Sequence, residues 1–195
     1  MSTPPDVEDG ETSPEQLGSG LGSDLLTRPA EPAPPIYLQL AESDSDSADM
    51  ADEYPSAQVT GVDLSPIQPN FVPPNCTFEV DDMTLPWTYG PAKFDFIHIR
   101  ELFGCIPDWD QFFQECMNAL KPGGYIEVVE HSVTPVADDA TMDSDHFFHV
   151  WGETVLQAGQ KFGKSFTIWE ESADRLRNLG FEEVVEHRYK WPMNG

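Results

Sequence analysis

Two acidic side chains follow predicted strands at positions where a parallel sheet can bind a ligand. Asp63 ends a predicted strand over residues 57–63, and Asp82 follows another predicted strand over residues 77–80. In open α/β sheets, ligands bind outside the carboxyl ends of the strands. A carboxylate can accept hydrogen bonds from ribose hydroxyls after one strand, and from an adenine amino group after the next. This pattern favours a nucleoside site that includes Asp63 and Asp82.

Histidines offer two further kinds of chemistry. Glu130 and His131 end a predicted strand, and His131 is a candidate general base because imidazole titrates near neutral pH. No partner for it is identifiable, so a polar pair at a strand end is the favoured interpretation. His146 and His149 are three residues apart on a predicted helix, which places both rings on one face. With no third ligand evident, we predict no metal site, and no catalytic residue is assigned.

Strands alternate with helices along most of the chain. Asp108 is a predicted helix N-cap, with Gln111 three residues later, and the Pro-Gly-Gly run at 122–124 is predicted to stop that helix. This alternation predicts an α/β fold with a largely parallel sheet. Strands are predicted over 57–63, 77–80, 94–99, 125–130 and 181–191, and helices from Asp108, over 144–163 and over 172–179.

The acidic excess excludes several classes of partner. The 195 residues carry a formal net charge of −25, and residues 1–53 hold 13 acidic residues but a single basic one. Such a field repels phosphate, so we predict no nucleic-acid partner and no anionic membrane surface. No apolar run approaches the roughly 20 residues that a membrane span needs. Three scattered cysteines indicate a reduced intracellular compartment, cytoplasmic or nuclear.

Several sequence strings resemble the class I S-adenosylmethionine-dependent methyltransferases, and most closely the fungal LaeA-like group associated with secondary metabolism. The strings D-L-S-P-I-Q-P, at 63–69, and V-P-P-N-C, at 72–76, are specific to that group. The resemblance extends over about residues 48–195. Its other parts are residues 51–57, 59–62, 78–82, 94–100 and 120–125, together with Trp109.

The resemblance implies a Rossmann-like doubly wound sheet, S-adenosyl-L-methionine as cofactor, and a set of cofactor-binding residues. Asp63, with the adjacent Leu64, corresponds to the ribose-binding acid, and Asp82 with Met83 to the adenine contacts. Arg100 is expected to line the cofactor cleft. The alternative for Arg100 is a simple surface ion pair with its neighbour in the chain.

One motif of that family has no counterpart in this sequence. The family opens with a first strand and a D-x-G-x-G-x-G turn, whose glycines let the backbone approach the cofactor. Those glycines should fall near Leu40, Glu42 and Asp44, where the sequence has no glycine. Side chains therefore stand where only glycine fits, and carboxylates stand where the cofactor's own carboxylate would lie. We expect cofactor binding to be weak or absent.

The missing turn shapes the predicted domain organisation. We predict an α/β, Rossmann-like sheet that is incomplete at its first strand, although residues 36–40 could supply a surrogate. Residues 1–46 are predicted to be a disordered acidic tail rich in proline and serine, because such a composition buries too little apolar surface to fold. Residues 47–195 are predicted to form a partial class I methyltransferase domain. Both ends look truncated relative to the family.

Three functions follow, in decreasing order of support. The first is a methyltransferase homologue linked to fungal secondary metabolite biosynthesis or its regulation, with an unknown small-molecule or protein methyl acceptor. The second is a non-catalytic pseudo-methyltransferase that acts as an interaction protein, with the acidic tail available to basic partners. The third, an NAD-type dehydrogenase, needs the same glycine turn and leaves the L-K-P-G-G junction at 120–124 unexplained. The missing glycines are compatible with a divergent paralogue or with a skipped exon.

Overall fold

A computed structural model describes residues 33–41, 44–66, 71–139 and 141–192. All of these belong to one compact unit. Along the chain, strands and helices alternate through most of its length. They are β1 Ile36–Ala41, α1 Asp44–Glu53, β2 Gln58–Asp63, β3 Cys76–Val80, β4 Phe94–Arg100, α2 Trp109–Ala119, β5 Leu120–Val129, α3 Phe147–Phe162 and α4 Ile168–Leu179.

The five strands form one parallel sheet in the order β3-β2-β1-β4-β5. Strand β1 lies at its centre, where Leu38 is opposite Thr60 of β2 on one side and Ile97 of β4 on the other. The prediction of a Rossmann-like sheet is therefore confirmed, whereas the prediction that it is incomplete at its first strand is wrong. The surrogate segment makes a full strand because Leu38 and Leu40 alternate into the core, where each is at most 1% exposed.

The folded region begins earlier than the sequence suggested. Strand β1 lies within residues 1–46, and α1 crosses the predicted boundary between residues 46 and 47. The acidic composition of this region concealed both elements, because α1 is polar along most of its length and buries only a narrow stripe that includes Ser47 and Ala51. The predicted tail over residues 1–32 lies outside the described residues.

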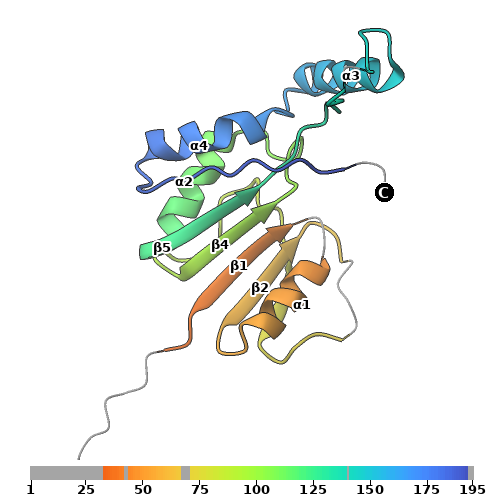
Figure 1. The fold of residues 1–195 in the computed structure, drawn as a ribbon. Coiled ribbons are helices and arrows are strands. Elements are labelled where there is room, and N and C mark those ends of the chain that lie inside the picture. Colours follow the sequence, from red (N-terminus) through yellow and green to blue (C-terminus); the bar gives the residue numbers. More distant parts are fainter. Residues whose placement is uncertain (1–32, 42–43, 67–70, 140, 193–195) are drawn as a thin grey trace, which may run out of the picture. The chain divides into compact units, whose positions relative to one another are not determined.

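Helices cover both faces of the sheet, as the doubly wound arrangement requires. Figure 1 shows α1 on one face and α2 with α4 on the other. Beneath α1, a small core contains Ala51, Val59 and Cys76. The larger core lies under α2 and α4 and includes Phe94 and Phe113, neither of which is measurably exposed.

Helix α2 follows its sequence signals closely. Oδ1 of Asp108 accepts the backbone N–H of Gln111 at 3.0 Å, as its predicted N-cap role requires. Phe112, Phe113 and Cys116 are buried along one face of the helix. Strand β5 then begins at once, at Leu120, and the Pro-Gly-Gly run lies inside that strand rather than in a separate loop.

Helix α3 holds the two histidines that were weighed as metal ligands. Nδ1 of His146 accepts the backbone N–H of Phe148 at 3.3 Å and caps the helix, while Nδ1 of His149 lies 3.7 Å from Glu153. Within the described ranges, no three His, Cys, Asp or Glu side chains are grouped as a metal site would need. None of the helices described is both long and apolar enough to cross a bilayer.

The prediction of a final strand over residues 181–191 is wrong, because this segment forms no strand. The segment contacts α4 and the loop after β5, and its Phe181 and Val184 pack against the larger core. The carbonyl of Val184 accepts a hydrogen bond from Arg177, the guanidinium of Arg188 lies over the Trp169 ring, and Nζ of Lys190 binds Asp138. A strand needs a neighbouring strand to complete its backbone hydrogen bonds, and the described part of this segment has none beside it.

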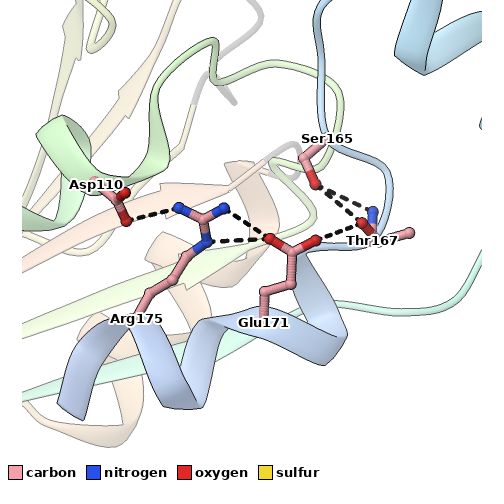
Figure 2. A network of polar contacts seen from close by, with 5 residues as sticks. All are labelled: Asp110, Ser165, Thr167, Glu171 and Arg175. Carbon is pink, nitrogen blue, oxygen red and sulfur yellow. Dashed lines mark hydrogen bonds and ion pairs between the residues drawn. The ribbon is translucent and has the colours of Figure 1, made fainter. Parts of the chain in front are cut away.

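A charged network joins α4 to α2 (Figure 2). The guanidinium of Arg175 on α4 donates to Glu171 one turn earlier, at 2.7 Å, and to Asp110 on α2, also at 2.7 Å. Glu171 in turn accepts the hydroxyl of Thr167 at 2.6 Å. The Thr167 hydrogen bond, and after it those from Arg175, hold the pKa of Glu171 below its usual range although partial burial opposes them.

Candidate functional site

The carboxyl ends of the five parallel strands meet at one edge of the sheet. From β1 the chain adds β2 and β3 outward on one side, and it then returns to the centre to add β4 and β5 on the other side. The strand order therefore reverses between β1 and β4, and these two strands form the topological switch point. Ligands of doubly wound proteins bind in the crevice outside this point. The residues predicted to bind the cofactor all lie at the ends of β2, β3 and β4, so the fold brings them to this common edge.

Asp63 is held in place at the end of β2. Its Oδ1 accepts the backbone N–H of Ser65 at 2.6 Å, and its backbone carbonyl accepts the N–H of Asp81 at 3.1 Å. The first bond is an Asx-type turn, which fixes the carboxylate at the strand end. The second ties the end of β2 to the residue after β3. The adjacent Leu64 is 67% exposed, so its side chain is accessible to a ligand.

Asp82 lies on the loop that follows β3. Its Oδ1 accepts both the hydroxyl of Thr84, at 2.7 Å, and the backbone N–H of Thr84, at 3.0 Å. These two bonds hold the pKa of Asp82 below its usual range, so the group is an anion and a hydrogen-bond acceptor at neutral pH. Met83 packs against the larger core and its carbonyl accepts Nε1 of Trp87 at 3.1 Å. The loop that carries Asp82 is thereby held by its bonds to Thr84 and by the bond from Trp87 to Met83.

Arg100, the last residue of β4, makes an ion pair that the sequence did not reveal. Its Nη1 lies 2.9 Å from Oδ2 of Asp46, in the first turn of α1. Its Nε also lies 3.7 Å from Oε1 of Glu101, the neighbour considered as an alternative partner. In the sheet register Arg100 is opposite Ala41, the last residue of β1. The Asp46–Arg100 ion pair therefore spans the switch point between β1 and β4.

The backbone turns sharply directly after β4. Glu101 has φ +56°, a left-handed conformation that is uncommon for residues other than glycine, while its N–H still bonds the carbonyl of Val129 at 3.0 Å. Such strained positions concentrate at ligand-binding and active sites. Glu101 thus turns the chain away from the sheet directly after Arg100, at the carboxyl end of β4.

Glu130 and His131, after β5, organise the loop between β4 and α2. The two carboxylate oxygens of Glu130 accept the backbone N–H groups of Leu102, at 2.8 Å, and Phe103, at 3.3 Å. The His131 ring packs edge-on against Phe103, with centroids 4.8 Å apart, and lies 6.3 Å from the Trp191 ring. Glu130 therefore positions this loop. The sequence favoured only a polar pair at a strand end and did not reveal these bonds.

The chemistry of this edge suits one half of the expected cofactor better than the other. Asp63 and Asp82 are fixed carboxylates at the ends of neighbouring strands, which suits a nucleoside that donates hydroxyl and amino hydrogens. The amino-acid tail of S-adenosylmethionine would have to fit beside the β1–α1 connection. Residues 42 and 43, which form this connection, lie outside the described residues and include no glycine, and in the first turn of the following helix the Asp46 carboxylate already binds Arg100. The described residues fit the nucleoside, and they do not fit the tail.

Comparison with known sequences gives a consistent result. Residues 23–187 match a family described as a methyltransferase domain. The methyltransferase pytC of Aspergillus terreus is 33% identical over 145 residues, which is 74% of this chain and 44% of pytC. The secondary metabolism regulator LAE1 of Cochliobolus heterostrophus is 35% identical over 148 residues, or 75% and 48% of the two chains. The protein-methionine methyltransferase laeA of Emericella nidulans is 33% identical over 150 residues, or 75% and 39%.

Solved structures show the same fold. Phosphoethanolamine N-methyltransferase 2 of Haemonchus contortus, in complex with phosphomonomethylethanolamine and S-adenosylhomocysteine, has a TM-score of 0.54 at 20% identity. A second structure of that enzyme, in complex with S-adenosyl-L-methionine, has a TM-score of 0.53, also at 20% identity. Each match covers 76% of this chain and 33% of the other. At this identity the likeness concerns the fold alone.

Proposed function

Because this chain belongs to the methyltransferase-domain family, we propose that it is an S-adenosylmethionine-dependent methyltransferase homologue linked to fungal secondary metabolism or its regulation. The named relatives support the link, since they comprise a fungal methyltransferase, a secondary metabolism regulator and a protein-methionine methyltransferase. The chain spans less than half the length of each of these relatives. The activity and the methyl acceptor of the whole protein are part of the proposal.

One observation carries the proposal. Asp63 and Asp82 are fixed at the carboxyl ends of two paired strands, in the fold and at the edge where this family binds its nucleoside. In this arrangement Asp63 accepts the ribose hydroxyls, while Asp82 and the backbone of Met83 contact the adenine. Leu64 borders the ribose. When bound, the cofactor supplies the methyl group, and the role of these residues is to bind and orient the nucleoside.

A second candidate function is a non-catalytic interaction protein with the same fold. It is favoured by the Asp46–Arg100 ion pair and by the absence of glycine from the β1–α1 connection, which together disfavour the cofactor's tail. In this role the acidic surface would bind basic protein partners, because opposite charges steer association. The cytoplasm or the nucleus is the proposed location for either function, and nucleic acid is not among the proposed partners.

Calorimetric titration separates the two functions. Adenosine and S-adenosylmethionine are titrated separately into the full chain, into Asp63→Ala, and into Asp174→Ala as a control at an exposed acid on α4. The methyltransferase proposal predicts saturable binding of both adenosine and S-adenosylmethionine that is lost in Asp63→Ala and kept in Asp174→Ala. If S-adenosylmethionine gives no heat at millimolar concentration, the methyltransferase proposal is wrong for this chain and the interaction role remains, whether or not adenosine binds.

A further inference from the structure

In the Asp46–Arg100 ion pair, a carboxylate of the protein itself binds a cationic side chain of the candidate site. The side chain of Asp46 is 20% exposed and that of Arg100 is 33% exposed, so most of the pair is shielded from solvent. Asp46 reaches it from the first turn of α1 and Arg100 from the end of β4. In the sheet register Arg100 is opposite Ala41, the last residue of β1, and Asp46 lies in the helix that follows β1, so the pair lies across the switch point.

The charges around Arg100 leave little attraction for another anion. Nη1 of its guanidinium lies 2.9 Å from Oδ2 of Asp46, and its Nε lies 3.7 Å from Oε1 of Glu101. A ligand carboxylate that approached Arg100 would have to displace Asp46 and would then lie beside an unpaired anion. Like charges at such a distance repel strongly where water is partly excluded. A ligand without a carboxylate meets no such penalty.

We propose that Asp46 is a specificity-determining residue that occupies Arg100 in place of a ligand's carboxylate. The site in its native form therefore binds adenine nucleosides without an amino-acid tail in preference to S-adenosyl amino acids. This inference rests on the proposed function, because it needs the nucleoside site of Asp63 and Asp82. Removal of the Asp46 charge leaves Arg100 with only the more distant Glu101 carboxylate among the ion pairs described, so Nη1 becomes available to the carboxylate of the tail.

The test compares two ligands that differ in the amino-acid tail. Adenosine and S-adenosylhomocysteine are titrated into the native chain and into Asp46→Asn, which keeps the side-chain size and removes the charge. Adenosine affinity is expected to stay the same. S-adenosylhomocysteine affinity is expected to rise about tenfold, the typical gain from one hydrogen bond to a charged group. Asp49→Asn, at an exposed position on the same helix, is the matched control and should change neither affinity.

A second variant tests whether Arg100 is the group that binds the carboxylate of the S-adenosylhomocysteine tail. In the double variant Asp46→Asn with Arg100→Met, the gain for S-adenosylhomocysteine should disappear while adenosine still binds. Circular dichroism and the unfolding midpoint show whether each variant is folded, and Asp46→Ser replaces Asp46→Asn if the latter is not. Equal affinity of the native chain and the folded Asp46 variant for S-adenosylhomocysteine would overturn the inference. Loss of adenosine binding in all variants would instead contradict the proposed function as well.

Discussion

Asp95 and Lys121 form an ion pair, with Oδ2 and Nζ 2.8 Å apart, at the amino edge of the sheet. The same Oδ2 accepts the backbone N–H of Ile36, the first residue of β1, at 2.7 Å. One carboxylate on β4 thus holds the starts of β1 and β5. This ion pair therefore lies at the edge of the sheet opposite the candidate site.

Replacement of Asp95 by alanine should destabilise the fold without altering the carboxyl edge. The variant loses the hydrogen bond from the Ile36 N–H at the start of β1 and the one from Nζ of Lys121 at the start of β5, so the free energy of unfolding should fall by about 1–2 kcal/mol. Urea unfolding measures the change. Asp138→Ala, which removes an exposed pair with Lys190, is the control and should lie within about 0.5 kcal/mol of the native value.

The stabilisation that Asp95 provides through Ile36 and Lys121 should also depend on pH. Burial tends to raise the pKa of Asp95, but the hydrogen bonds from Lys121 and the Ile36 N–H outweigh it and hold the pKa below its usual range. Since the folded pKa is depressed, the contribution to stability is complete above the ordinary aspartate value of about 3.9 and is lost as the pH falls through the folded pKa. Unfolding midpoints of the native chain and Asp95→Asn should therefore differ most at neutral pH and converge in acid.

Gly61→Ala should disturb the packing of α1 on β2. An added Cβ would lie 2.5 Å from Oγ of Ser47 and 2.6 Å from Cε1 of Phe78, so the helix or the ring must shift. Such overpacking costs about 1–3 kcal/mol. Gly90→Ala is the matched control because a Cβ there meets no atom of the described structure within 4 Å. Comparable stability of both variants, measured by thermal unfolding, would show that α1 packs differently.

Arg175→Met should loosen the contact between α2 and α4. The variant keeps the aliphatic stem and removes the bonds to Asp110 and Glu171, so we expect a loss of about 1 kcal/mol that shrinks at high salt. Hydrogen exchange in α4 should rise. Exchange in α2 should rise as well, because α2 loses the bond that Asp110 accepts from Arg175. Arg177→Met removes the bonds from Arg177 to Asp174 and to the Val184 carbonyl, neither of which involves α2, and should leave the exchange of α2 unchanged. Equal exchange in both variants would contradict the cross-helix role of Arg175.

The three cysteines should differ sharply in reactivity. Cys105 is exposed, whereas Cys76 and Cys116 are buried. Burial raises the pKa of the Cys76 and Cys116 thiols, which lowers their content of reactive thiolate. A thiol reagent should modify one group quickly in the native chain and none quickly in Cys105→Ser. Rapid modification of two or three thiols before unfolding would mean that the core opens readily.

Much of the fold could be predicted from local patterns. The strand that ends at Asp63 and the helix capped by Asp108 have the apolar periodicity, cap and stop residues that specify an element without help from distant residues. The prediction failed where an element depends on its neighbours. Strand β1 was undervalued because its burial comes from β2 and β4, and residues 181–191 pattern as a strand but lie along α4.

By itself, the sequence determined the family, the α/β class and the two acids, Asp63 and Asp82, that follow neighbouring strands. Each of these depends on residue types at short spacing, which a single chain displays directly. The tertiary structure decided that Asp46 neutralises Arg100 across 54 residues, and that Glu130 holds the loop after β4. A carboxylate in an acidic segment has many possible partners, and only the parallel pairing of β1 with β4 brings one particular guanidinium within 2.9 Å of it.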